Sequence, residues 1–183
     1  FNRNKRSVVV DLKRPEGHAL TMRLLKPADV LVENMAPGTI DRLGLGYERI
    51  REENPRLIFC SIKGFLSGPN QSRLLTDHAA QMISGLAYMT GPPGTPLRAG
   101  GSVVDIGAAV FAVVGILGAL LQRNQTGEGQ HVTAGIFETA LLYMGQHIAK
   151  AQLSGEAPKP FSTKGAVAQT FICEFGIAHR QGL

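Results

Sequence analysis

The chain has 183 residues, of which 44% are hydrophobic and 18% are charged. This length and composition exclude a disordered chain and predict a globular protein with a sizeable core. The net charge of +5 suits an anionic partner, but the basic residues are dispersed and tryptophan is absent, which argues against nucleic acid. The two cysteines form no C-x-x-C pair, which predicts a cytoplasmic protein with Cys60 as a buried thiol.

The first part of the chain alternates between strand-like and helix-like patterns. Strands are predicted at residues 7–10, 29–32 and 57–62. Helices are predicted from Pro15 onward, over Thr39–Leu43 and over Tyr47–Glu53. The alternation predicts an α/β fold with parallel strands, and in such sheets ligands bind beyond the carboxyl ends of the strands.

The second part of the chain reads as mostly helical. Helices are predicted over Asp77–Tyr88, over the uncharged run 106–122 and over Val132–Leu153, and a strand is predicted over Val167–Cys173. The uncharged run is shorter than the roughly 20 apolar residues of a membrane span, so we expect a buried core helix and no membrane partner. No metal is expected, because His131, Glu138 and His147 lack the spacing of metal ligands.

One aspartate, Asp105, stands where the glycine-rich stretch Pro92–Val104 meets the start of the long uncharged helix. A helix N-terminus favours an ionised carboxylate, and an ionised, sheltered carboxylate beside flexible backbone suits a nucleophile. The segment Ser102–Asp105 also fits a capping box, in which the two side chains only close the helix end. The local pattern leaves both roles open and favours the cap.

Short segments in a fixed order link the chain to a known family. They are Asn4–Ser7, Val10–Lys13, Asp29–Asn34, Pro37-Gly38, Asp41–Gly44, Asn54–Ile58, Gly101–Asp105, Arg123 and Thr126–Gln130. With these segments the chain resembles the class III CoA-transferases, a group that includes formyl-CoA transferases, carnitine CoA-transferases and α-methylacyl-CoA racemases. The resemblance implies an interlocked homodimer and a Rossmann-like α/β large domain, here truncated at both ends. Residues 1–154 would be part of that CoA-binding domain, and 155–183 would be a linker and the start of a smaller domain.

The resemblance also assigns roles to residues. It makes Asp105 the catalytic nucleophile, which attacks an acyl-CoA and passes through a mixed anhydride and an aspartyl-CoA thioester that an acceptor carboxylic acid resolves. Coenzyme A would be contacted by Val10, Asp11, Leu12, Lys13, Asn34, Met35, Ala36, Arg42, Arg73, Leu74, Leu75 and Thr76. A lysine that the family pattern places near Leu74 is absent, and Arg73 beside it is the expected substitute.

Thr76 bears on which reaction the family resemblance implies. The racemases have a histidine at the position aligned with Thr76, because proton exchange beside a thioester needs an acid–base group on each face of the carbon. Threonine cannot serve at neutral pH, and His78 would point elsewhere on its helix. We therefore expect CoA transfer, with an acyl-CoA racemase or isomerase and an inactive CoA-binding fragment as the alternatives.

Overall fold

The computed structural model describes residues 2–160. The chain divides into two compact units. Unit 1 contains residues 1–63 and 112–134, and unit 2 contains residues 64–111 and 135–183. The long helix α6 (Val103–Thr126) contributes residues to both units. The predicted division at residue 154 stays a prediction, and helix α7 ends at that residue.

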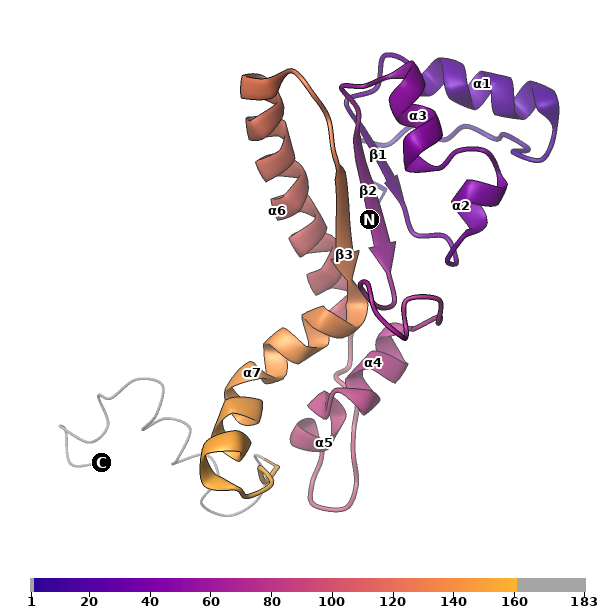
Figure 1. The fold of residues 1–183 in the computed structure, drawn as a ribbon. Coiled ribbons are helices and arrows are strands. Elements are labelled where there is room, and N and C mark those ends of the chain that lie inside the picture. The colour runs from indigo at the N-terminus through magenta and orange to yellow at the C-terminus, as the bar shows by residue number, and fades with distance from the viewer. Residues whose placement is uncertain (1, 161–183) are drawn as a thin grey trace. The chain divides into compact units, whose positions relative to one another are not determined.

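Unit 1 is built on a small sheet with the order β1-β2-β3. The strands are β1 (Val30–Glu33), β2 (Ile58–Lys63) and β3 (His131–Gly135). β1 and β2 are parallel, with Val30 opposite Ile58 and Glu33 opposite Ser61. The three arrows point the same way in Figure 1. The predicted α/β fold with a parallel sheet is therefore confirmed.

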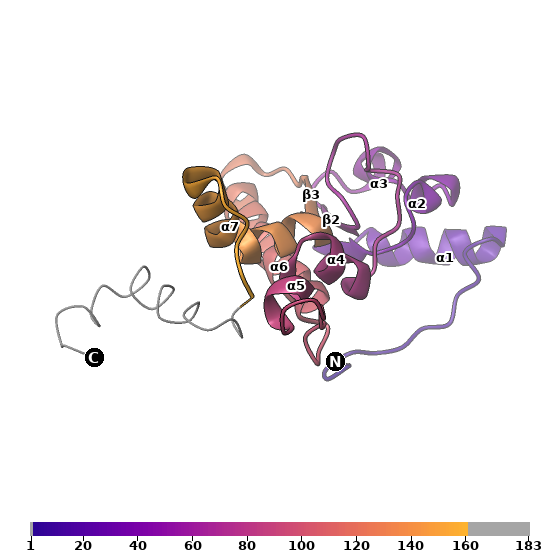
Figure 2. The same cartoon turned by 90° about the horizontal axis from the view of Figure 1, so that it is seen from below.

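Successive strand residues point to opposite faces of the sheet, so apolar side chains on each face need a covering layer. Helices α1 (Pro15–Leu25), α2 (Thr39–Arg42) and α3 (Tyr47–Glu53) lie together beside the strands (Figures 1 and 2). One core cluster contains Leu25, Ile40, Ile50 and Phe59, and another contains Cys60, Ala112 and Ala134. Cys60 is fully buried, as predicted, and burial followed by the charge of Glu33 raises the pKa of its thiol.

Unit 2 is helical in the part that the structure describes. Its helices are α4 (Asp77–Ile83), α5 (Leu86–Thr90), the first turns of α6, and α7 (Ile136–Ser154). The buried side chains of Ala80, Val104 and Ala140 form its core cluster. These small side chains let α4, α6 and α7 approach closely around the point where α6 begins.

Three secondary-structure predictions are wrong. Residues 7–10 are not a strand, and Val9 there is 98% exposed. The helix predicted over Asp77–Tyr88 is two helices, because Gly85 takes a left-handed conformation with φ of 86° between them. Residues 132–135 belong to strand β3 and not to the following helix. The strand predicted over Val167–Cys173 lies outside the described residues.

The expectation of a buried core helix after Asp105 is also wrong. α6 is long and apolar enough to cross a membrane, and 28% of its most apolar window, of mean hydropathy 2.4, is buried. Its buried positions carry small side chains such as Ala108, Ala112 and Ala119, which allow close packing. Several of its large apolar side chains are exposed, and Leu117 and Leu121 are 56% and 68% exposed.

Candidate active site

The start of helix α6 is closed by a side chain from helix α4. Oδ1 of Asp77 accepts hydrogen bonds from the backbone amides of Val104 at 2.8 Å and Asp105 at 3.2 Å. Asp77 is buried, and its charge suits the positive end of the helix. The capping box proposed for Ser102 and Asp105 is therefore not what satisfies these amides. The cap comes from Asp77, which stands 28 residues earlier in the chain.

A fully buried glutamine connects this cap to the glycine-rich loop. Nε2 of Gln81 donates to Oδ2 of Asp77 at 2.6 Å and to the carbonyl of Gly101 at 3.4 Å. Oε1 of Gln81 accepts from the amide of Ala99 at 2.8 Å. Arg98 approaches the same carboxylate, with Nη2 3.7 Å from Oδ2 of Asp77. The loop before Asp105 is thus held by two buried side chains of one short helix.

Asp105 itself is exposed, and its carboxylate makes no hydrogen bond or ion pair within residues 2–160. Partial desolvation and, second, the negative charge of Asp77 raise the pKa of the Asp105 carboxyl above its ordinary value. The helix N-terminus alone would lower that pKa, so the other two effects outweigh it. The expectation of a sheltered carboxylate is wrong, and what stands at the helix start is an accessible, unpaired one.

The glycines before Asp105 leave open space. A Cβ atom added at Gly100 or Gly101 would meet no other atom within 4 Å among the described residues. Packing inside the described chain therefore does not require glycine at either position. A substrate can approach the backbone closely there, which is a common use of glycine beside a ligand.

The segment Arg73–Thr76 lies in the same unit as Asp105. Thr76 is the N-cap of α4, and its hydroxyl accepts from the amide of Ala79 at 3.4 Å. Leu75 packs against the core cluster of unit 2, whereas Leu74 is 74% exposed. Arg73 is exposed and donates to the side chain of Asn70 at 3.3 Å. Through Asp77, the next residue, the chain brings Thr76 close to the start of α6.

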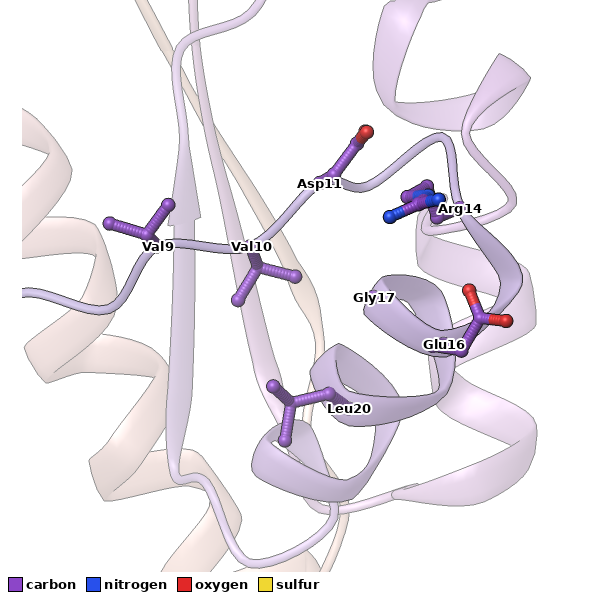
Figure 3. Close-up of a pocket in the computed structure, with 7 residues that line it drawn as sticks. All are labelled: Val9, Val10, Asp11, Arg14, Glu16, Gly17 and Leu20. Carbon is purple, nitrogen blue, oxygen red and sulfur yellow. The ribbon is translucent and has the colours of Figure 1, made fainter.

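The other predicted CoA contacts lie in unit 1. Asp11 makes a local turn, in which its Oδ1 accepts from the amide of Lys13 at 3.0 Å. Val10 and Asp11 help to line a surface pocket of ≈ 390 Å³ at the start of α1, where Figure 3 shows them opposite Gly17 and Leu20. A side chain at Gly17 would overlap the carbonyl of Asp11. Leu12 instead turns inward and packs on the core of unit 1.

A buried ion pair shapes the turn after β1, where Asn34 and Ala36 are exposed. Nζ of Lys63 lies 2.7 Å from Oε1 of Glu33 and donates to the carbonyl of Met35 at 2.9 Å. Oε2 of Glu33 accepts from the amide of Met35 at 3.0 Å. Met35 then packs on the same core cluster as Leu12, so both predicted CoA-binding segments of unit 1 rest on one core.

Arg42 is the basic residue nearest in sequence to this turn. It is exposed on α2, and its Nη2 donates to the hydroxyl of Thr39 at 2.8 Å. Gly38 begins the helix with φ of 71°, a conformation that favours glycine. The guanidinium is therefore held by its own helix and keeps other donors available for an anion.

Sequence reasoning missed three residues that organise the site. Asp77, Gln81 and Lys63 are each half-buried or buried and bond to backbone of a predicted functional segment. The pair Asp77 and Gln81, four apart in a helix that starts at a threonine cap, was a usable signal. Within residues 2–160, no group of three or more His, Cys, Asp or Glu side chains is placed to hold a metal ion.

Comparisons with known proteins converge on one family. Residues 1–177 match the family model described as CoA-transferase family III. A formyl-CoA:oxalate CoA-transferase of Rhodopseudomonas palustris (strain TIE-1) is 43% identical over 142 residues, covering 77% of this chain and 33% of the relative. A succinate–glutarate CoA-transferase of Agrobacterium fabrum is 40% identical over 159 residues, covering 86% of this chain and 40% of the relative.

A solved structure gives the same result. The crystal structure of a CAIB/BAIF family protein from Brucella suis superposes with a TM-score of 0.83 and 37% identity, covering 87% of this chain and 43% of that one. The chain spans about a third of the formyl-CoA:oxalate relative and two fifths of the succinate–glutarate relative.

Proposed function

Because the chain belongs to CoA-transferase family III, we propose that Asp105 is the nucleophile with which the protein moves CoA from an acyl-CoA to a carboxylic acid. The observation that carries this proposal is the state of the Asp105 side chain. It is exposed and unpaired within the described residues, although it stands at a helix start whose amides a second carboxylate, Asp77, already satisfies. Asp105 is thus released from capping and free to react.

The reaction balances with no group besides the two substrates and Asp105. An Oδ of Asp105 attacks the thioester carbonyl, the C–S bond breaks, and CoA departs as a thiolate, so that a mixed anhydride of Asp105 and the acyl group remains. The thiolate attacks the Asp105 carbonyl, which expels the first acid and leaves an aspartyl-CoA thioester. The acceptor carboxylate attacks that thioester and expels the thiolate. Finally, the thiolate attacks the acceptor carbonyl, which yields the new acyl-CoA and restores Asp105.

The loop before Asp105 suits this chemistry. Each attack on a carbonyl builds negative charge on oxygen, which nearby N–H donors stabilise. Gly100 and Gly101 leave room for a substrate to reach their backbone, as the open space around both positions indicates. Hydrogen bonds with Gln81 also hold this loop, at the Ala99 amide and at the Gly101 carbonyl.

The family resemblance implies CoA contacts in each unit, and the exposed groups there suit such a role. In unit 1, the exposed groups at Asp11, Lys13, Asn34, Ala36 and Arg42 border the turns that follow the predicted first strand and β1. In unit 2, Arg73 supplies an exposed guanidinium and Leu74 an exposed apolar surface. This mixture of cations and apolar groups suits a ligand that carries phosphates and a pantetheine arm.

A racemase is the less favoured reading. The hydroxyl of Thr76 caps α4, and a threonine hydroxyl cannot act as a general acid or base for the α-carbon at neutral pH. His78 is exposed two residues later on the same helix. If the protein were a racemase, it would exchange deuterium into the α-carbon of an acyl-CoA without any acceptor acid.

We further propose that the protein works as a homodimer. Support comes from the outward side of α6 in unit 1, where Val113, Val114, Leu117 and Leu121 are each more than half exposed. A row of large apolar side chains at helical spacing is usually covered in the working protein. Sedimentation of the full-length protein checks this, and a monomer at micromolar concentration contradicts it.

Trapping of the acylated aspartate tests the proposed function. The full-length protein is incubated with an acyl-CoA and hydroxylamine, which converts an aspartyl anhydride or thioester into a stable hydroxamate. Mass spectrometry of the digest is expected to place the hydroxamate on Asp105. Asp105→Asn should remove it, and Glu48→Gln, an exposed carboxylate on α3, should not. Transfer activity without any adduct on Asp105 would overturn the proposal.

A further inference from the structure

The carboxamide of Gln81 has one orientation that its surroundings allow. Its Oε1 faces the amide of Ala99, and its Nε2 faces two acceptors, the Asp77 carboxylate and the Gly101 carbonyl. A flipped carboxamide would set donor against donor and oxygen against carboxylate. Because the side chain is fully buried, water cannot replace these bonds, so each is strongly enforced.

The loop that Gln81 holds has little order of its own. Residues 100 and 101 are both glycine, which loses more conformational freedom on folding than any other residue. No side chain of the described residues would contact a Cβ at either position within 4 Å. The bonds from Gln81 to the residues on each side of Gly100 are therefore what restricts this stretch.

The same carboxamide also acts on the helix cap. Its bond to Oδ2 fixes the rotation of the Asp77 carboxylate, whose Oδ1 then receives the amides of Val104 and Asp105. Gln81 therefore reaches the first turn of α6 by two routes, through the loop and through Asp77. Met82, its neighbour on α4, is exposed instead.

We propose that Gln81 is a positioning residue for Asp105, which ties residues 99–101 to Asp77 and so fixes the direction in which α6 presents the nucleophile. This inference rests on the proposed function of Asp105. Gln81 is not placed in contact with substrate and acts through the loop and the cap. A displacement of a nucleophile by about 1 Å can slow a reaction about 100-fold.

The test compares two Gln81 variants with a control in the full-length protein. Gln81→Met keeps the volume and removes all three hydrogen bonds, and Gln81→Asn keeps the amide but is too short to span from Asp77 to Ala99. Met82→Gly is the control, because Met82 is exposed on the same helix and a glycine there weakens that helix without touching the loop. The measurements are the rate of hydroxamate formation at Asp105, the dissociation constant of CoA and the melting temperature.

Both Gln81 variants are expected to slow hydroxamate formation, by about 100-fold for Gln81→Met, with the CoA dissociation constant within about twofold of the unaltered protein. Met82→Gly should lower the melting temperature by a similar amount and keep the rate within about twofold. Equal slowing in all three variants, or none in the Gln81 variants, overturns the inference and leaves the proposed function intact. Absence of the adduct in the unaltered protein overturns both.

Discussion

The carboxylate of Asp77 accepts a hydrogen bond from the backbone amide of Asp105 at 3.2 Å. One acidic side chain thereby closes the helix that carries the other. This relationship separates two roles that the sequence pattern assigned to one residue. Asp77 satisfies the helix start, and Asp105 keeps an exposed carboxylate.

Replacing the cap should destabilise unit 2. Asp77→Ala removes the acceptor for two amides at the start of α6, and loss of an N-terminal cap costs about 0.5–2 kcal/mol of unfolding free energy. Ser102→Ala, at the position that the sequence suggested as the cap, should change it by less than about 0.5 kcal/mol. Urea unfolding of both variants checks this, and a larger loss for Ser102→Ala would contradict the assignment.

The raised pKa of Asp105 makes its ionised form unfavourable in the folded protein. Below the unfolded pKa of about 4, both states hold the proton and the effect is absent. As pH rises through the folded pKa, the folded state loses stability because the unfolded state gives up its proton more readily. Asp105→Asn should therefore be more stable than the unaltered chain at pH 7, since it carries no charge there.

Denaturant unfolding at about pH 7 and about pH 3 measures this difference. The stability gained by Asp105→Asn should shrink at the acid value, where the Asp105 carboxyl is protonated in both the folded and the unfolded state. Glu48→Gln serves as the control, because it removes an exposed charge on α3. A gain that is the same at both pH values would show that the Asp105 charge is not responsible.

The ion pair after β1 should contribute far more to the free energy of unfolding than a surface pair does. Lys63→Met leaves Glu33 buried without its partner, which costs about 3–5 kcal/mol of unfolding free energy. Arg49→Met breaks two exposed pairs, with Glu52 and Glu53, which solvent screens, and should cost far less unfolding free energy. Hydrogen exchange of the β1 and β2 amides provides the measurement. Equal losses in the two variants would contradict the difference in burial.

Two glycines of α6 should respond oppositely to alanine. A methyl group at Gly107 would overlap the Tyr143 hydroxyl of α7, so Gly107→Ala should destabilise unit 2 by about 1–3 kcal/mol. A methyl group at Gly118 meets no atom of residues 2–160 within 4 Å, so Gly118→Ala should stabilise the chain by about 0.5–1 kcal/mol. Thermal unfolding distinguishes the two, and a loss at Gly118 would show that this face of α6 is covered.

Local sequence signals predicted the helix ends that are marked by proline. Pro15 in a first turn gave the correct start of α1, and Asn54-Pro55 after a last turn gave the correct end of α3. Residues 132–135 were missed because their strand depends on pairing with the sheet and runs straight into α7. Ser84 and Gly85 look unremarkable inside a helical pattern, although the left-handed Gly85 divides it.

The candidate site could be predicted only in part, for a similar reason. Asp105 is visible because a carboxylate between a glycine-rich stretch and an apolar run is unusual. Asp77 accepts a hydrogen bond from the amide of Asp105, which is 28 residues away in the chain. Gln81 accepts one from the amide of Ala99, which is 18 residues away. The spacing of Asp77 and Gln81 is visible in the sequence, but the backbone groups that they bond to are not, since hydrogen bonds between distant segments depend on tertiary packing.

The path of oxygen through Asp105 is the most direct test of the central claim. A single turnover of the full-length protein is run with an acceptor acid whose carboxylate carries heavy oxygen. When the thiolate opens the final anhydride at the acceptor carbonyl, one acceptor oxygen stays on Asp105, so its peptide should gain one heavy oxygen. Formation of the new acyl-CoA with an unlabelled Asp105 peptide would contradict the account.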